Sequence, residues 1–141
     1  GMLVGSCLAG ISFLKGLGFV HAISHMVGAE FDTQHGLTNA IVLPVVLRYN
    51  LPSLDEKRLQ MADALNINDK TTDGFVGDIE ATLNRLDIPK SLSSIGVPLD
   101  CASRVAEKAM FDSAASTNPV KGNSTDIKAL IERSILEARR L

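Results

Sequence analysis

Residues 16–50 read GLGFVHAISHMVGAEFDTQHGLTNAIVLPVVLRYN and contain all three histidines of the chain. His21 and His25 are four residues apart, so a helix presents both imidazoles on one face, about one turn apart. A loop at residues 31–34 is expected to bring His35 to the start of the next helix. The segment therefore predicts two helices that place three imidazoles near one another.

Three neutral imidazoles at this spacing could converge on one divalent cation. An HxxxH pair alone is a weak signal, and Ala22 stands where a metalloprotease would carry its glutamate base. Spacing alone leaves two alternatives open, a metal site and structural histidines on a half-buried face. Imidazole suits zinc and ferrous iron alike, so the spacing does not choose the metal.

The rest of the chain shows helical rather than strand periodicity. In the last segment Ile127, Leu130, Ile131, Ile135 and Ala138 fall on one face, with Asn123 or Ser124 available to cap its start and Arg139 and Arg140 in its last turn. Further helices are expected at about residues 37–50, 54–65, 72–86 and 98–111. Pro44 should kink or restart the first of these. The pattern predicts an all-α fold, a compact multi-helix bundle forming a single domain over residues 2–141.

The N-terminal residues are treated separately. Gly1 before Met2 is interpreted as a tag remnant. The apolar stretch from Met2 to Leu14 lacks a basic region before it, and Lys15 ends it short of the roughly 20 residues that a membrane span requires. We therefore expect a buried core helix here, with no membrane partner and no signal peptide.

Composition excludes several classes of function. The chain has 141 residues, 45% of them apolar, a net charge of −2, no Trp and one Tyr, so it offers no basic patch or stacking platform for nucleic acid. No Gly-rich phosphate loop between a strand and a helix is present, so no dinucleotide site is expected. Cys7 and Cys101 are far apart, which favours two buried or half-buried thiols in a cytoplasmic protein.

The segment from Gly16 to Pro44 resembles the second signature of the iron-containing alcohol dehydrogenases. The matching residues are His21, His25, Gly28, His35 and Gly36. The stretch LDIPKSLSSIGVPLD at residues 86–100 is similar to a further family segment, and Phe111-Asp112 through Thr117-Asn118-Pro119 resembles the family turn before the last helix. The resemblance covers nearly the whole chain in the family's order.

This resemblance implies the helical C-terminal domain of dehydroquinate synthase-like, iron-containing alcohol dehydrogenases. In such enzymes a divalent metal, iron or possibly zinc, lies in the cleft between this domain and an N-terminal nucleotide-binding domain. Of its four ligands, one Asp and three His, two match His21 and His35. His25 matches a histidine outside the ligand set, near the substrate and nicotinamide, and is expected to relay a proton. The implied reaction interconverts alcohols and aldehydes with NAD or NADP.

Nothing in the 141 residues matches the nucleotide-binding domain or the first ligand pair, and Gln34 replaces a proline common in the family. The chain alone is therefore expected to be inactive. One alternative is a non-catalytic helical module, a homo-oligomer derived from such an enzyme. Another is a small metal carrier in which His21, His25 and His35 all ligate. Glu30 and Asp32 are expected to cap or solvate the loop, and Asn39 to fix backbone near it.

Overall fold

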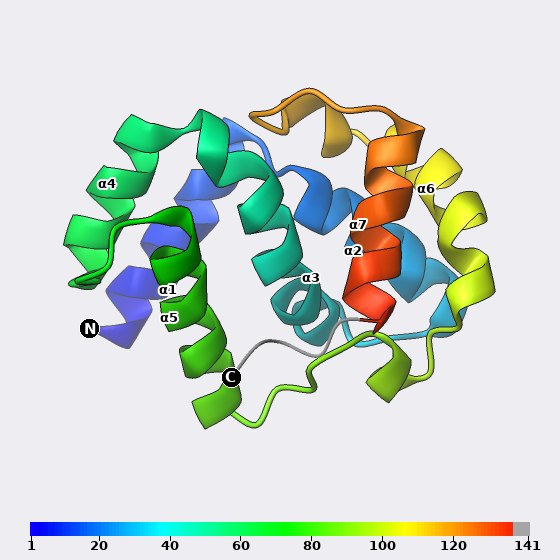
Figure 1. Cartoon of the computed structure of the whole chain (residues 1–141), viewed down its shortest axis with the longest axis horizontal. Coiled ribbons are helices and arrows are strands. Elements are labelled where there is room, and N and C mark those ends of the chain that lie inside the picture. Colours follow the sequence, from blue (N-terminus) through cyan, green and yellow to red (C-terminus); the bar gives the residue numbers. More distant parts are fainter. Residues whose placement is uncertain (137–141) are drawn as a thin grey trace.

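The computed structural model describes residues 1–136. This part of the chain is helical and contains no β-strand, which confirms the all-α prediction (Figure 1). The α-helices are α1 (Met2–Ser12), α2 (Phe19–Phe31), α3 (His35–Asn50), α4 (Asp55–Leu65), α5 (Thr72–Arg85), α6 (Ala102–Met110) and α7 (Ser124–Leu136). Short 3₁₀ turns connect them, among them η1 (Phe13–Lys15), η4 (Leu99–Cys101) and η5 (Ala115–Thr117).

The predicted helices are present, with small differences at their ends. The expected helix at 98–111 is divided into η4 and α6, and α3 begins at His35 rather than residue 37. The prediction that Pro44 restarts this helix is wrong, because α3 continues through Pro44 to Asn50. Neighbouring helices bury this part of α3, so packing compensates for the hydrogen bond that proline removes. Asn123 caps α7 as expected, since its side-chain Oδ1 accepts from the backbone N–H groups of Thr125 and Asp126.

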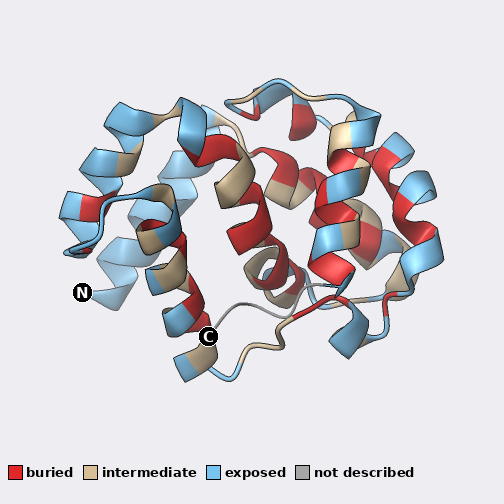
Figure 2. Cartoon of the chain, in the orientation of Figure 1, coloured by how far each residue is buried: buried red, intermediate tan, exposed pale blue. Residues whose placement is uncertain are grey.

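The main core lies between α2, α3, α6 and α7, which occupy the centre and right of Figure 1. The inward faces of these helices are buried, and their outward faces are exposed (Figure 2). The described apolar residues predicted for the last helix, Ile127, Leu130, Ile131 and Ile135, are buried in α7. In α6 the buried residues are Ala102, Val105, Ala106 and Ala109. Ala138, Arg139 and Arg140 lie outside the described residues. The small side chains of α6 allow its backbone to approach α2 and α7 closely.

A second, smaller core joins α4 and α5 to the end of α3. It consists of Leu51, Ala62, Ile67, Phe75 and Val76. An ion pair also connects α3 with α5: the Arg48 guanidinium of α3 donates to both carboxylate oxygens of Glu80 in α5, at 2.8 and 3.0 Å. The side chain of Glu80 is only 4% exposed. The single-domain extent of residues 2–141 stays a prediction, since it includes residues beyond 136.

The prediction of a buried core helix at the N-terminus is only half right. Residues 2–12 form α1, but none of them is buried, and Leu3 and Leu8 are 88% and 62% exposed (Figure 2). Apolar residues surround this helix on all sides, so no face is distinguished as the one to bury, and its main contact is with the adjoining η1. Cys7 is therefore exposed, against expectation, while Cys101 is buried, and both thiols are free.

Among the described residues, no single helix is long and apolar enough to cross a membrane. The segments Met2–Lys15 and Phe19–Phe31 reach that length and composition only when counted together, and they are bent by 97° relative to each other.

Candidate metal centre

The start of α2, which carries His21 and His25, is held by a distant loop. Asn118 Oδ1 accepts the backbone N–H of Phe19 at 3.1 Å, and Thr117 Oγ1 accepts that of Leu17 at 3.1 Å. The chain can approach this loop because Gly18 has φ of +145° and no side chain. A Cβ there would lie 3.0 Å from Asn118 Oδ1. The position of the first helical turn, and with it His21, is thus fixed from residues 117–118.

Asn118 itself is fixed by a reciprocal pair of amides. Its Nδ2 donates to Asn50 Oδ1 at 2.9 Å, while Asn50 Nδ2 donates to Asn118 Oδ1 at 3.1 Å. Asn118 Nδ2 also donates to the carbonyl of Val120 at 2.7 Å. Asn118 is 3% exposed, so these bonds are shielded from water. The pair joins the end of α3 to the start of α2.

His35 is placed by a short reversal between α2 and α3. Asp32 ends α2 in the left-handed conformation, with φ of 53°, and Gln34 caps α3 by accepting the N–H of Leu37. Thr38 Oγ1 donates to Thr33 Oγ1 at 2.8 Å, which ties the turn to α3. Asp32 therefore has the capping role that was expected. His35 becomes the first residue of α3 and faces back toward α2.

The three imidazole rings meet in a triangle. The ring centroids of His21 and His35, and those of His25 and His35, are 5.3 Å apart, and those of His21 and His25 are 5.8 Å apart. The rings of His25 and His35 are stacked, with planes 18° apart. Phe13 from η1 packs edge-on against His21, with ring centroids 5.7 Å apart. The spatial convergence expected from the sequence is present.

Asn39 shows where two of these rings point. Its Nδ2 lies 3.0 Å from His35 Nε2 and 3.4 Å from His21 Nε2. An amide nitrogen can only donate, so both Nε2 atoms act as acceptors and direct their lone pairs to one point. Asn39 Oδ1 is buried and has no hydrogen-bond partner among the described residues. The expectation that Asn39 fixes backbone near the loop is wrong, because its side chain contacts the histidines.

His25 has a different partner. Its Nδ1 lies 2.9 Å from Asp112 Oδ2, and the Asp112 side chain is 13% exposed. The other carboxylate oxygen, Oδ1, accepts the backbone N–H of Ala114 at 2.8 Å. Asp112 is thus held in position by its own loop and holds the His25 ring in turn.

Burial lowers the pKa of His21, and the neighbouring His35 and His25 lower it further, while Asp112 opposes the shift. A lowered pKa keeps this imidazole neutral near pH 7, the form that binds a metal. The lowered pKa and the contact with Asn39 Nδ2 therefore agree on a neutral His21 whose Nε2 lone pair faces that amide.

The arrangement suits half of a metal site rather than a complete one. Within residues 1–136, no group of three or more His, Cys, Asp or Glu side chains is placed to hold a metal ion. Two imidazole nitrogens do converge, and imidazole is a good ligand for divalent iron and zinc. The donor set therefore fits a cation that takes its remaining ligands from outside these residues.

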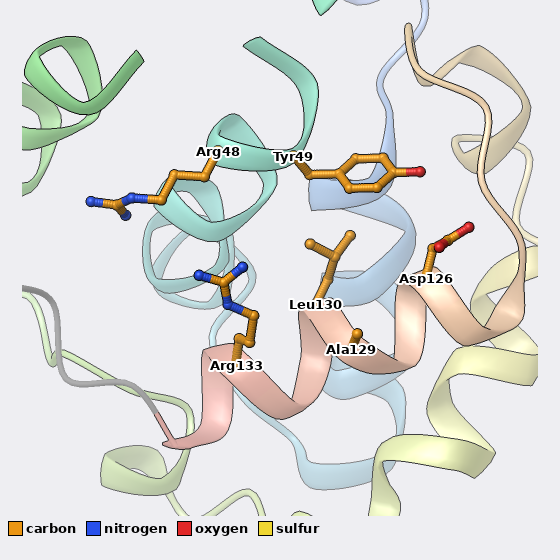
Figure 3. A pocket seen from close by; sticks show the side chains of 6 residues that line it. All are labelled: Arg48, Tyr49, Asp126, Ala129, Leu130 and Arg133. Atoms are coloured by element: carbon orange, nitrogen blue, oxygen red, sulfur yellow. The ribbon is translucent and has the colours of Figure 1, made fainter. Parts of the chain in front are cut away.

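Two other charged features lie apart from the histidines. Glu30, at the end of α2, pairs with Arg104 and Lys108 of α6, so it connects two helices rather than capping the loop. A cavity of about 330 Å³ lies between α3 and α7, and no histidine lines it (Figure 3). The Arg48 guanidinium at its edge points away from Tyr49 and Asp126, toward its partner Glu80. Burial, with a contribution from Asp126, raises the pKa of the Tyr49 hydroxyl.

Sequence reasoning missed three residues that contact the histidines: Phe13, Asn39 and Asp112. Asn39 had a usable signal, since it lies four residues after His35 and therefore on the same helical face. Asp112 is separated from His25 by 87 residues, and no local pattern connects the two.

Comparison with known proteins shows one family. The family model described as "Fe-containing alcohol dehydrogenase family, C-terminal" matches residues 1–135. The chain is 36% identical over 140 residues to 1,3-propanediol dehydrogenase of Klebsiella pneumoniae, covering 94% of this chain and 36% of that protein. It is 32% identical over 136 residues to lactaldehyde reductase of Escherichia coli K12, covering 92% of this chain and 36% of that protein.

Solved structures agree with this result. The crystal structure of 1,3-propanediol oxidoreductase matches with a TM-score of 0.79 and 34% identity, over 84% of this chain and 33% of that one. Alcohol dehydrogenase from Oenococcus oeni matches with a TM-score of 0.74 and 31% identity, over 84% of this chain and 32% of that one. The chain thus spans about a third of the length of the relatives that it matches.

Proposed function

This chain belongs to the Fe-containing alcohol dehydrogenase family, as its resemblance predicted, and from that premise we propose that it supplies half of the metal centre of an alcohol dehydrogenase. In this proposal His21 and His35 bind a divalent metal, iron or possibly zinc, and His25 relays a proton. The reaction is the interconversion of a small alcohol and its aldehyde with NAD or NADP.

One observation carries the proposal: Nε2 of His21 and Nε2 of His35 both lie within hydrogen-bond distance of the single Asn39 Nδ2 atom. A divalent cation held by these two imidazoles would need two lone pairs directed to one point in this way. The neutral state of His21 near pH 7 supports the same role.

The chemistry depends on where each group lies. When bound, a divalent metal polarises the alcohol oxygen and favours its alkoxide, which eases the departure of hydride to the nicotinamide ring. His25 lies beside both proposed ligands, and its own side chain is 36% exposed to solvent. It can therefore accept the hydroxyl proton and pass it away from the metal.

The relatives support two further parts of the proposal, the class of substrate and the need for additional metal ligands. The names of two of them, 1,3-propanediol dehydrogenase and lactaldehyde reductase, indicate small hydroxylated or carbonyl substrates. This chain spans about a third of each, and it supplies two ligands where even an open catalytic site usually has three. We infer that these residues alone bind metal weakly and are inactive. The free thiols of Cys7 and Cys101 support a reducing, cytoplasmic location.

A metal titration tests this function. The purified chain is titrated with Zn²⁺ by calorimetry, and with Fe²⁺ under anaerobic conditions, alongside His21→Ala, His35→Ala and His25→Ala. We expect weak one-to-one binding that the first two substitutions abolish and the third leaves nearly unchanged. Equal losses in all three variants would instead favour a metal carrier with three histidine ligands. Tight binding that survives His21→Ala would refute the proposed ligand pair.

A second candidate function, a non-catalytic oligomerisation module, is favoured by the exposed apolar surface of α1 and η1. Leu3, Leu8 and Leu14 are 88%, 62% and 87% exposed, an arrangement that self-association would cover. Sedimentation velocity over a hundredfold range of concentration separates the two candidates. A concentration-dependent oligomer that Leu8→Gln dissociates would support the module, whereas a monomer throughout the range would contradict it.

A further inference from the structure

The contact between Asp112 and His25 distinguishes one histidine from the other two. We propose that Asp112 is a positioning residue that fixes the Nδ1–H tautomer of His25, and so leaves Nε2 of that ring free to accept a proton. This role rests on the proposed function, because it specifies which nitrogen of His25 receives the proton of the alcohol.

The carboxylate of Asp112 determines which nitrogen of His25 carries a proton. An ionised Asp side chain can accept hydrogen bonds but cannot donate them. One of its oxygens, Oδ1, already accepts the Ala114 N–H at 2.8 Å, which orients the carboxylate. The other, Oδ2, lies 2.9 Å from His25 Nδ1, so this nitrogen must carry the proton of the bond.

The neutral ring has only one N–H, and placing it on Nδ1 leaves Nε2 with a free lone pair. The His25 ring also packs against His35, with ring centroids 5.3 Å apart and planes 18° apart. Within residues 1–136, no carboxylate is hydrogen-bonded to His21 or His35. Their Nε2 atoms face the Asn39 amide instead. The two kinds of partner separate the proposed ligands from the proposed acceptor.

The resulting step balances. The O–H bond of the alcohol breaks, its electron pair remains on oxygen, and the proton forms a new N–H bond at His25 Nε2. The ring then carries a positive charge, which Asp112 stabilises through the Nδ1–H bond that is already in place. No proton has to move to Asp112 for this to happen, as in the orienting role of a carboxylate beside a catalytic histidine.

Nuclear magnetic resonance tests the tautomer directly, without a metal or cofactor. Long-range ¹H–¹⁵N correlation spectra of the ¹⁵N-labelled chain near neutral pH report which nitrogen of each neutral imidazole is protonated. A charge-assisted hydrogen bond is strong enough to bias the tautomers of His25 at least about tenfold toward Nδ1–H. In Asp112→Asn, whose amide can also donate, we expect this bias to be lost, and in Asp112→Glu to be partly restored. Ser113→Ala, an exposed change in the same loop, serves as the matched control.

Each outcome decides the proposal. Nδ1–H at His25 in the parent chain, lost in Asp112→Asn and kept in Ser113→Ala, supports it. Nε2–H or an even mixture in the parent chain overturns it, whether or not any variant folds. A Zn²⁺ titration of Asp112→Asn tests whether Asp112 instead supports a metal ligand. We expect the Zn²⁺ affinity to change less than twofold. A loss of about 10–100-fold would show that Asp112 supports a metal ligand, and would overturn the acceptor role. The proposed function itself would fail in a different measurement, if His21→Ala left the Zn²⁺ affinity unchanged.

Discussion

Replacing Asn118 by Ala should destabilise the fold and release the start of α2. The substitution removes four hydrogen bonds: one from the Phe19 N–H, two in the reciprocal pair with Asn50, and one to the Val120 carbonyl. Because Asn118 is 3% exposed, water cannot readily satisfy the groups left behind. The loss therefore acts on the end of α3 and the start of α2 together.

The magnitude follows from those bonds. Each buried hydrogen bond contributes about 1 kcal/mol net, so removing four should lower the free energy of unfolding by about 4 kcal/mol. That is a large share of the roughly 5–15 kcal/mol typical of a domain. With a urea m-value of about 2 kcal/mol/M, the unfolding midpoint should fall by about 2 M.

Urea unfolding followed by far-ultraviolet circular dichroism measures the midpoint, and amide hydrogen exchange at Phe19 measures the local effect. Ser116→Ala, an exposed change in the same loop, is the matched control and should alter the free energy of unfolding by no more than about 0.5 kcal/mol. If Asn118→Ala lowers the midpoint no more than Ser116→Ala does, and hydrogen exchange at Phe19 is unchanged, Asn118 does not hold the start of α2 in the way described.

Three further predictions concern the helices around the histidines. Arg48→Met should lower the free energy of unfolding by about 3–5 kcal/mol in urea, because the Glu80 side chain, 4% exposed, would keep an unpaired charge; Arg48→Met/Glu80→Met should recover most of this loss, and a double variant no more stable than the single one would contradict it. Asn39→Asp should raise Zn²⁺ affinity at least about tenfold in calorimetry by adding a third ligand between His21 and His35; unchanged affinity would mean that their lone pairs do not converge. Burial, and after it the neighbouring His35, lowers the pKa of His21 in the folded protein. As the pH falls, the imidazole at position 21 therefore takes up a proton at a higher pH in the unfolded chain than in the folded one. The stability that neutral His21 contributes is complete above about pH 6.5 and declines below it. In His21→Asn the urea unfolding midpoint should therefore fall less between about pH 7.5 and pH 5.5 than it does in the parent chain. An equal fall in both proteins would count against a lowered pKa of His21.

The helices could be predicted because their information is local. In α7, Ile127, Leu130 and Ile131 recur at helical spacing, and each is buried as that spacing requires. The pair of His21 and His25 follows the same rule, since four residues make about one turn. The N-terminal helix shows where the rule ends: apolar residues predict burial only if a partner surface exists, and α1 has little contact beyond η1.

The contacts that position the site were not predictable, because they join residues far apart in the chain. Asp112 reaches His25 across 87 residues, and Arg48 reaches Glu80 across 32. Such pairs depend on how whole helices pack, and no spacing rule covers them. The resemblance to the family marked Asp112, Thr117 and Asn118 as a shared turn. Only the structure shows that each of these three side chains contacts α2 or the residues just before it.

The hydrogen bonds that hold the start of α2 have a consequence for folding during translation. Thr117 and Asn118 bond to residues 100 and 99 positions earlier. At about 5–20 residues per second, the ribosome adds residues 36 to 118 in roughly 4–17 s after His35. Throughout that interval the nascent chain contains all three histidines but neither Thr117 nor Asn118. The imidazoles are therefore synthesised early and oriented late, and a truncated chain that stops before Asp112 carries the same histidines without the residues that orient them.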